Sequence, residues 1–301
     1  MSVTASAPGS MMVIGEHAVV LGGPALVAAI DQRAHVQVDA LEGDKVELHS
    51  QIAPPLETRL GTPPGSGPYR FLLAALTAVG VDRGVRITTT SEIDPTMGLG
   101  SSAAITVAAL GALSAFMGRA ADDVHDRALV IVRAIQGRGS GADLAASARG
   151  GLLRYALRDG ALTADMDAMP NPPVIALKYV GYKTPTGEVL ARVEEAAEKR
   201  PDHYRSTYEA MRLCASAGVA AAQDASWDAL AAQMDAYQGL MTALGVSDDA
   251  LEALVEEARD AGAMAAKISG SGLGDCVMSF GAVPPGWTEV PLAPHGLIID
   301  G

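Results

Sequence analysis

The sequence is poor in cysteine and in basic residues. Cys214 and Cys276 are the only cysteines among 301 residues, and they lie far apart in the chain. This argues against a disulfide scaffold or a cysteine-based zinc site and favours a reducing, cytoplasmic location. Only 22 Lys and Arg stand against 35 Asp and Glu, which gives a net charge of −13. Since nucleic-acid binding needs a basic surface, we expect no nucleic-acid partner.

Long hydrophobic runs are missing as well. Apolar stretches such as Val27–Ile30 and Val174–Leu177 are too short to span a bilayer, so we expect no membrane partner. The beginning of the sequence also lacks the charged start and apolar centre of a secretory signal. Aromatic residues make up 4% of the chain, whereas 49% of all residues are hydrophobic. The core must therefore be built mainly from Ala, Leu, Val, Ile and Met, in one large domain or two modest ones.

Helix-like and strand-like segments are mixed without the regular alternation of βαβ units. Alternating or β-branched segments predict strands at Met11–Ile14, Ala34–Ala40, Val46–His49, Val85–Thr90, Leu152–Leu157, Val174–Val180, Met264–Ile268 and Cys276–Phe280. Apolar residues spaced by three and four predict helices at Phe71–Val79, Ser101–Met117, Val124–Ile135, Glu188–Lys199, Tyr204–Gln223, Trp227–Leu244 and Asp248–Ala261. The segment Ala53–Pro68, crowded with Pro and Gly, predicts a surface loop. This mixture predicts an α+β architecture with domains at residues 1–155 and 156–301.

The segment Pro95–Ala104 (PTMGLGSSAA) places glycines and serines ahead of a predicted helix. Glycines let main-chain amides approach an anion closely, and a helix N-terminus offers unpaired N–H groups and the positive end of the helix dipole. Ser101 or Ser102 can add a hydroxyl to a phosphate oxygen or to Mg²⁺. An ordinary loop with a serine N-cap is the alternative interpretation.

Two further segments carry glycines beside polar residues. Gly270, Gly272 and Gly274 alternate within Lys267–Cys276 between two predicted strands, a pattern that is also typical of a hairpin turn. Asp143 follows a glycine-rich stretch at a point where a helix can start. A carboxylate at this position either complements the helix dipole or orients and deprotonates a substrate hydroxyl, as phosphoryl transfer requires.

The motifs of the common nucleotide-binding enzymes are absent. No G-x-x-x-x-G-K-[ST] sequence occurs, which excludes a P-loop NTPase, and the H-R-D and D-F-G elements of protein kinases are missing too. Lys267–Cys276 is not a dinucleotide fingerprint, because no helix follows it. Any nucleotide must therefore be held by another kind of loop.

Taken in order, these segments resemble the three motifs of the GHMP kinase family, named for galactokinase, homoserine kinase, mevalonate kinase and phosphomevalonate kinase. Ala7–Val20 (APGSMMVIGEHAVV) resembles the first motif, Pro95–Ala104 the second and Lys267–Cys276 the third. The motifs span nearly the whole chain. The resemblance implies an α+β fold with a ribosomal-S5-like N-terminal half, a ferredoxin-like C-terminal half and an active site between them.

The resemblance also implies ATP and Mg²⁺ as cofactors, with Ser102 as a metal ligand. The residues expected to hold the ATP phosphates are Gly98, Leu99, Gly100, Ser101, Ser102 and Ala103. The residues expected to bind the acceptor are Glu16, His17, Ser140, Gly141, Lys267, Ser271 and Gly272. The expected catalytic residues are Asp143, Lys183 and Arg138.

Within the family, the runs Ser140–Ser147 and Gly274–Cys276 are similar to those of bacterial phosphomevalonate kinases. They imply transfer of the γ-phosphoryl group of MgATP to 5-phosphomevalonate, giving 5-diphosphomevalonate, in the mevalonate pathway of isoprenoid biosynthesis. The run Gly15–Val20 is closer to mevalonate kinases, so mevalonate is the alternative acceptor. A non-catalytic nucleotide sensor is a third hypothesis. The apolar stripe of Trp227–Leu244 serves either the core or a homodimer interface.

The chain departs from the family pattern at two positions. Many mevalonate-pathway kinases have a lysine after A-P-G, where this chain has Ser10, and mevalonate kinases have a Mg²⁺-binding glutamate where this chain has Val132. An acceptor that is already a phosphate monoester has an ionised oxygen near neutral pH, which makes the loss of the lysine more tolerable. Cations must then neutralise two anions. The candidates are Arg138, Lys183 and Lys267, followed by Arg70 and Arg133.

Overall fold

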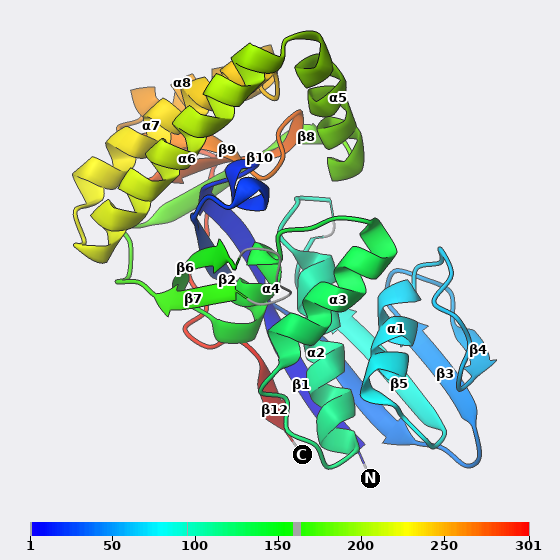
Figure 1. Ribbon diagram of the computed structural model, residues 1–301. Coiled ribbons are helices and arrows are strands. Elements are labelled where there is room, and N and C mark those ends of the chain that lie inside the picture. The colour runs from blue at the N-terminus through cyan, green and yellow to red at the C-terminus, as the bar shows by residue number, and fades with distance from the viewer. Residues whose placement is uncertain (1, 95, 159–163, 301) are drawn as a thin grey trace.

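Two β-sheets, each carrying its own layer of helices, form the two lobes of the molecule (Figure 1). The computed structural model describes residues 2–94, 96–158 and 164–300, so Pro95 of the second motif lies outside it. The predicted α+β class is confirmed. Every helix within these ranges is too short or too polar to span a bilayer.

The first sheet is built around two long paired strands. In spatial order its main path runs β12 (Ile298–Asp300), β1 (Ser2–Ile14), β2 (Ala25–Ala40), β5 (Val85–Ser91), β3 (Lys45–Ser50) and β4 (Leu56–Arg59). The start of β2 also pairs with β6 (Leu152–Leu157), which pairs with β7 (Ala164–Ala168). Register shifts at Pro8/Gly9 and Met12/Ile14 bend β1 where it reaches the other lobe.

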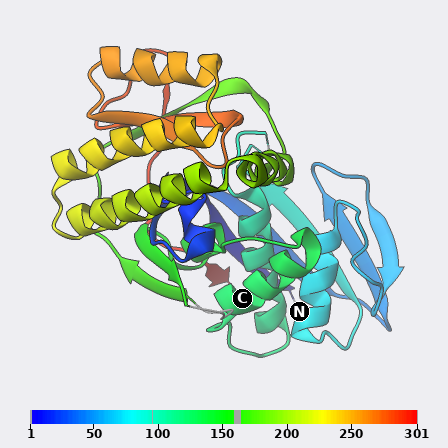
Figure 2. The ribbon, with the colours of Figure 1, turned by 45° about the horizontal axis from the view of Figure 1, so that its top comes forward.

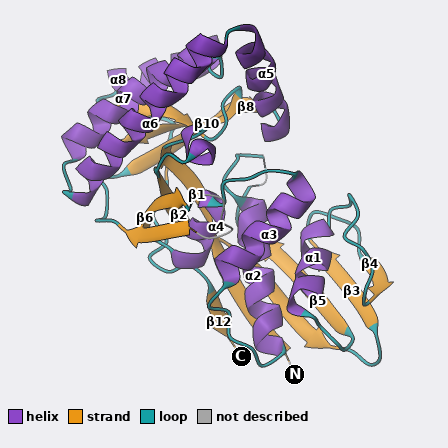
Figure 3. Cartoon of the chain, in the orientation of Figure 1, coloured by secondary structure: helices purple, strands orange, loops and turns teal. Residues whose placement is uncertain are grey.

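A layer of helices covers one face of this sheet (Figure 3). Its members are α1 (Arg70–Val79), α2 (Ser101–Phe116), α3 (Val124–Gln136) and α4 (Ala142–Arg149). Helix α2 is central and packs on β1 and β2 as well as on the other three helices. Its alanines are almost all buried, and their small side chains let the helix approach the sheet closely. This packing fixes where the N-terminus of α2 lies.

The second sheet lies at the other end of β1. Its antiparallel strands follow the order β11 (Thr288–Glu289), β8 (Ile175–Lys183), β10 (Gly274–Phe280) and β9 (Ala265–Ser269). The accompanying helices are α5 (Thr186–Lys199), α6 (Pro201–Gln223), α7 (Trp227–Leu244) and α8 (Asp249–Asp260). Helices α7 and α8 pack on the sheet, whereas α6 packs on α7 and on the turn after β1 (Figure 2). One hydrophobic core joins this lobe to β1 and β2.

Several elements differ from the sequence prediction. The predicted loop at Ala53–Pro68 contains the edge strand β4, which its flanking prolines and glycines disguise. Strand β7 was not predicted, because its sequence ADMDA has little strand propensity and owes its conformation to pairing with β6. The expected domain boundary at 155/156 falls inside β6, and the chain passes to the second sheet only after β7. Strand β12 then returns to the first sheet.

The apolar stripe of α7 faces inward. Met234 and Tyr237, both in this stripe, are fully buried in the core of the second lobe. Of the two alternatives that the sequence left open for the stripe, the core is the one the structure shows.

Candidate active site

The second motif forms a tight bend that ends in a helix. Gly98 and Gly100 have φ angles of 70° and 68°, and Gly100 occupies the N-cap of α2. A Cβ on Gly100 would lie 2.1 Å from Oγ of Ser10, and one on Gly98 would lie 2.6 Å from the carboxyl carbon of Asp275. Only glycine fits both positions. No side chain of the described residues caps α2, so its first amides and its dipole remain available to an anion.

The end of β1 lies directly against this bend. The amide of Ser10 donates a hydrogen bond to the carbonyl of Leu99 at 3.0 Å, and a Cβ on Gly9 would lie 2.6 Å from the same oxygen. The family lysine position is therefore a buried serine packed on the phosphate-binding loop. Val132, the other departure from the family pattern, is buried beside Gly139 and supplies no oxygen ligand.

Asp143 lies in the first turn of α4. Gly141 precedes it with a φ angle of 84°, and the Tyr155 hydroxyl donates to the carbonyl of Ser140 at 2.5 Å, which fixes the turn into the helix. Solvent reaches the Asp143 side chain, yet protein atoms crowd around the carboxyl. This burial raises the pKa of Asp143, while Ser10 and Lys183 oppose the rise. Although Ser10 Oγ faces the carboxyl, it completes no hydrogen bond of normal geometry within the described residues.

A lysine from β8 and an aspartate from β10 form an ion pair beside the phosphate-binding loop. The Nζ of Lys183 lies 3.1 Å from Oδ1 of Asp275, although the pair lacks hydrogen-bond geometry. Asp275 is almost completely buried, and burial raises its pKa against the opposing influence of Lys183. Lys183 stays partly exposed and thus remains within reach of a ligand.

Glu16 and Lys267 form a second, fully buried pair between the lobes. Nζ of Lys267 donates to Oε1 of Glu16 at 2.5 Å and also to the carbonyl of Ile268. The Tyr237 hydroxyl donates to the carbonyl of Glu16 at 2.5 Å. Lys267 was expected to meet the acceptor, but its side chain has no exposed surface in this structure. It instead neutralises Glu16 and ties the turn after β1 to β9.

His17 follows Glu16 in an unusual backbone conformation, with a φ angle of 58°. Its Nε2 donates to the carbonyl of Ser271 at 2.9 Å, so Nδ1 is left as the acceptor of the neutral ring. Burial is the main cause that lowers the pKa of His17, and the charge of Lys267 lowers it further. Gly272, the next residue in the loop, has a φ angle of 86° and packs on the carbonyl of Val246.

Buried polar atoms without a hydrogen-bond partner gather at this place. In the described part of the chain they are Ser10 Oγ, Glu16 Oε2, His17 Nδ1, Ser271 Oγ and Asp275 Oδ1. All belong to β1, to the turn after it, or to the segment that joins β9 to β10 and starts β10. Asp275 Oδ1 nevertheless lies 3.1 Å from Lys183 Nζ. Since buried polar groups are almost always paired, the other four atoms are candidates for contacts with a ligand.

Arg138 lies farther out than the other predicted residues. Its guanidinium donates to Glu194 of α5 at 2.8 Å in a solvent-exposed ion pair that connects the two lobes. The two weaker candidates make local contacts: Arg133 donates to the carbonyl of Gly139, and Arg70 donates to that of Gly67. Neither pairs with a carboxylate of the site.

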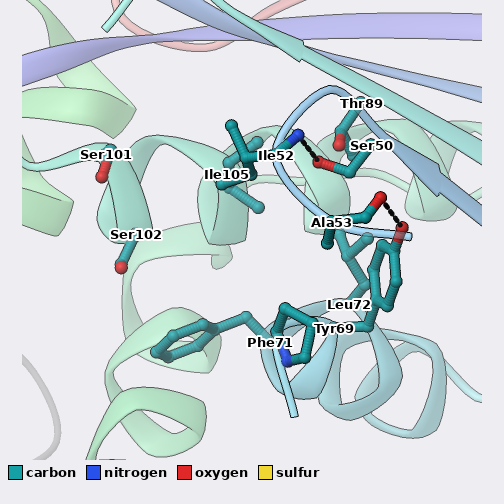
Figure 4. Close-up of a pocket in the computed structure, with 11 residues that line it drawn as sticks. Ser50, Ile52, Ala53, Tyr69, Phe71, Leu72, Thr89, Ser101, Ser102 and Ile105 are labelled. Carbon is teal, nitrogen blue, oxygen red and sulfur yellow. Dashed lines mark hydrogen bonds between the residues drawn. The ribbon is translucent and has the colours of Figure 1, made fainter. Parts of the chain in front are cut away.

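A hollow beside α2 was missed by the sequence analysis. Its volume is about 100 Å³, smaller than the roughly 300–1,000 Å³ of typical small-molecule sites. Its residues come from β3, the loop after it, α1, β5 and α2, as Figure 4 shows: Ser50, Ile52, Ala53, Pro68, Tyr69, Phe71, Leu72, Thr89, Ser101, Ser102 and Ile105. Ser101 and Ser102 belong both to this hollow and to the phosphate-binding bend. No short motif links these segments, so the sequence gives no signal for the hollow.

The oxygen donors near the bend suit a magnesium ion held mainly by phosphates. No group of three or more His, Cys, Asp or Glu in the described residues could hold a metal alone. Mg²⁺ in phosphoryl-transfer sites usually takes one or two protein ligands and completes its shell with substrate phosphates and water. The exposed Ser102 at the start of α2 and the nearby carboxylate of Asp143 fit that requirement.

Comparisons with known proteins agree with this arrangement. Residues 68–151 match the GHMP kinases N terminal domain, residues 219–282 the GHMP kinases C terminal domain, and residues 2–40 the galactokinase galactose-binding signature. The chain is 34% identical to mevalonate kinase of Aeropyrum pernix, over 92% of this chain and 87% of that protein.

Solved structures extend the comparison. The mevalonate kinase of L. major in complex with R-mevalonate is 25% identical with a TM-score of 0.76, covering 92% of this chain and 86% of that one. Phosphomevalonate kinase of Streptococcus pneumoniae is 18% identical with a TM-score of 0.75, covering 94% and 93%, and thus shares the fold. The expectation that the chain is most like the phosphomevalonate kinases is therefore wrong, since its curated relatives are mevalonate kinases. The chain belongs to the GHMP kinase family.

Proposed function

We propose that this protein is a mevalonate kinase, which transfers the γ-phosphoryl group of MgATP to the hydroxyl of mevalonate. The observation that carries the proposal is the 34% identity to a mevalonate kinase over 92% of this chain. The place of Asp143 in the first turn of α4, facing Ser10, which packs on the bend, agrees with an alcohol acceptor.

An alcohol acceptor gives Asp143 a defined task. The hydroxyl oxygen forms a bond to the γ-phosphorus, the bond from that phosphorus to the β–γ bridging oxygen breaks, and ADP leaves. The hydroxyl proton must go to a base in reach, for which a carboxylate of raised pKa is better suited than an ordinary one. Lys183 and Arg138 are the proposed cations for the phosphates, and Arg138 must leave Glu194 to serve.

The nucleotide has a continuous path across the first lobe. The hollow of Figure 4 would take part of the nucleoside. Ser101 and Ser102 connect it to the bend at Gly98 and Gly100, whose amides and helix dipole would hold the phosphates. Mg²⁺, when bound, would neutralise phosphate charge, with Ser102 as its proposed protein ligand. Leu99 and Ala103 contribute main-chain atoms to the same bend.

The acceptor would lie beside Asp143. Contact with Glu16 Oε2, His17 Nδ1 and Ser271 Oγ, which are buried without partners, would require this side of the site to open. Glu16 and His17 would then accept from hydroxyls of the acceptor, and Ser271 would donate to its carboxylate. Ser140 and Gly141 precede Asp143 and would line the same side, with Gly272 next to Ser271.

A cytoplasmic location stays a prediction, in keeping with two free, buried cysteines. The homodimer also stays a prediction.

An ADP-release assay tests the proposal directly. The purified protein is supplied with MgATP and, in separate reactions, with R-mevalonate, 5-phosphomevalonate or galactose; we expect turnover with mevalonate alone. Asp143→Asn should lower kcat on mevalonate by about 10²- to 10⁴-fold. Asp122→Asn, at an exposed site remote from the bend, is the matched control and should act as the wild type. Absence of mevalonate-dependent ADP release, or full activity of Asp143→Asn, would contradict the proposal.

A further inference from the structure

Asp275 lies where the register of β10 and β8 is irregular. Gly274 pairs with Lys183 and Cys276 pairs with Tyr179, so residues 180–182 of β8 stand opposite Asp275 alone. Asp275 itself has a φ angle of 65°, which a non-glycine residue rarely adopts. Such backbone angles persist where the surroundings enforce them.

The Asp275 carboxyl lies directly against the phosphate-binding bend. A Cβ on Gly98 would lie 2.6 Å from its carboxyl carbon and 2.7 Å from Oδ1, and Asp275 is only 5% exposed. A buried negative charge at an anion-binding bend opposes phosphate binding unless a cation accompanies it. An acidic residue at this position therefore requires a compensating cation.

Lys183 supplies that cation and is shared with a second carboxylate. Its Nζ lies 3.1 Å from Oδ1 of Asp275, and its charge opposes the rise in the pKa of Asp143. The ammonium is partly exposed, so a ligand can reach it. Within the described residues Lys183 is the sole cation that pairs with Asp275, and Asp143 has no ion-pair partner.

We propose that Asp275 is a positioning residue, which holds the Lys183 ammonium between the phosphate-binding bend and Asp143, where the transferred phosphoryl group passes. The inference rests on the proposed phosphoryl transfer. A free lysine side chain samples many rotamers, and its fixation by Asp275 removes that cost before the substrates bind. The carboxylate thereby helps phosphate binding although it carries the same sign of charge.

The charged and titratable groups around the pair are few. Lys183 faces Asp275 from β8, while Cys276 and Asp94 lie near on the same side. The Cys276 thiol has its pKa raised to about 12 by burial, and its Sγ donates to the carbonyl of Met97, so it stays neutral. Ser10, Lys183 and Glu16 are the groups that act on Asp143.

A double-mutant cycle tests the proposal with the full-length protein. Lys183→Met should lower kcat by about 10²- to 10³-fold, the usual loss for one stabilising group in the transition state. Asp275→Asn should lower kcat by roughly 10- to 100-fold, with KM for the acceptor little changed, because it leaves the lysine present but unfixed. The double variant should be no slower than Lys183→Met, since Asp275 acts only through the lysine.

Asp275→Gly provides the control for backbone strain. Glycine and asparagine both tolerate a positive φ angle, so both variants should fold, with an unchanged circular dichroism spectrum, and should lose the same activity. Wild-type kcat in Asp275→Asn, or losses that multiply in the double variant, would overturn the proposal. So would recovery of Asp275→Asn by raised Mg²⁺, which would place the carboxylate on the metal.

The wild-type control separates this inference from the proposed function. If the wild type phosphorylates an acceptor other than mevalonate, the proposed function fails, and the same cycle run with that acceptor still tests Asp275. If mevalonate is the acceptor and the cycle shows no coupling, the positioning role fails and the proposed function stands.

Discussion

The two walls of the site handle charge by different means. The proposed phosphate-binding wall uses main-chain geometry: two left-handed glycines, Gly98 and Gly100, and an uncapped helix start, with no charged side chain of its own. The proposed acceptor wall and its border with the bend use side chains in pairs, namely Glu16 with Lys267 and, at the border, Lys183 with Asp275. The first wall is specified within one short segment. The second needs residues far apart in sequence, so it depends on how the two sheets meet.

Breaking the buried pair should have the largest effect. Lys267→Met leaves the Glu16 carboxylate buried without its cation, which should lower the free energy of unfolding by about 3–5 kcal/mol. Urea unfolding followed by circular dichroism measures the loss. Glu16→Gln combined with Lys267→Met removes both charges and should restore part of the stability. A single variant as stable as the wild type would show that this pair does not support the acceptor wall.

A methyl group at the bend tests the main-chain wall. Gly100→Ala places a Cβ 2.1 Å from Ser10 Oγ, and we expect kcat/KM for ATP to fall about 10²-fold through displacement of the bend. Gly118→Ala is the matched control: Gly118 has nearly the same φ angle, 66° against 68°, but nothing lies near the added methyl group. It should cost only the backbone strain of about 1–2 kcal/mol. Equal ATP kinetics in both variants would remove the steric argument.

The burial of Asp143 predicts opposite effects on activity and stability. Its folded-state pKa is raised, so kcat/KM for the acceptor should fall as pH drops through a value above that of an ordinary aspartate. The same shift means that the folded state binds the proton more tightly than the unfolded state. Stability therefore decreases as pH rises from the unfolded pKa through the folded one, and the deficit persists at neutral pH.

Asp143→Asn should accordingly melt at a higher temperature than the wild type at pH 7 and at the same or a lower temperature below pH 3. Differential scanning calorimetry at the two pH values makes the comparison. A variant less stable than the wild type at neutral pH would show that the carboxylate is favourably placed, against the burial that raises its pKa.

Breaking the exposed Arg138–Glu194 ion pair between the lobes should have the smallest effect on stability and activity. Glu194→Gln releases Arg138 from α5, but both side chains are solvent-exposed, so the free energy of unfolding should change by less than about 1 kcal/mol. If Arg138 leaves Glu194 to meet phosphate, KM for ATP or the acceptor should improve slightly, and the gain should vanish in high salt. Steady-state kinetics at low and high ionic strength provide the check, with Glu195→Gln as the neighbouring control.

Local patterns made the first wall predictable from sequence, and distance in the chain hid most of the second. The glycines of Pro95–Ala104 indicated an anion site because positive φ angles and helix starts are local properties. The helix start at Asp143 was predicted for the same reason, and α4 begins at Ala142; its catalytic role stays a prediction. The pairing of Lys267 with Glu16 depends on two sheets meeting. Composition and spacing alone cannot give such a contact.

The helices and strands show the same contrast between features that local sequence specifies and features that distant residues specify. Long helices such as α6 and α7 were predicted within a few residues, since their apolar periodicity is strong. Strands β4 and β7 were missed because their neighbours, rather than their own residues, specify them. The identity of the acceptor was the hardest feature to predict from the sequence. The shared G-D-C run favoured phosphomevalonate kinases, whereas similarity over the whole chain favours mevalonate kinases.

The pairing of β12 with β1 determines when the edge of the first sheet can be completed during translation. It pairs with Thr4, Ala5 and Ser6 of β1, so strands from opposite ends of the described residues lie side by side, as the neighbouring N and C marks in Figure 1 also show. A ribosome adding about 5–20 residues per second needs tens of seconds to deliver this partner. Throughout that interval one rim of β1 offers free peptide groups to other nascent chains, which is a known route to aggregation. Yield in the cell should therefore depend on chaperone supply during translation more than on the stability of the finished enzyme.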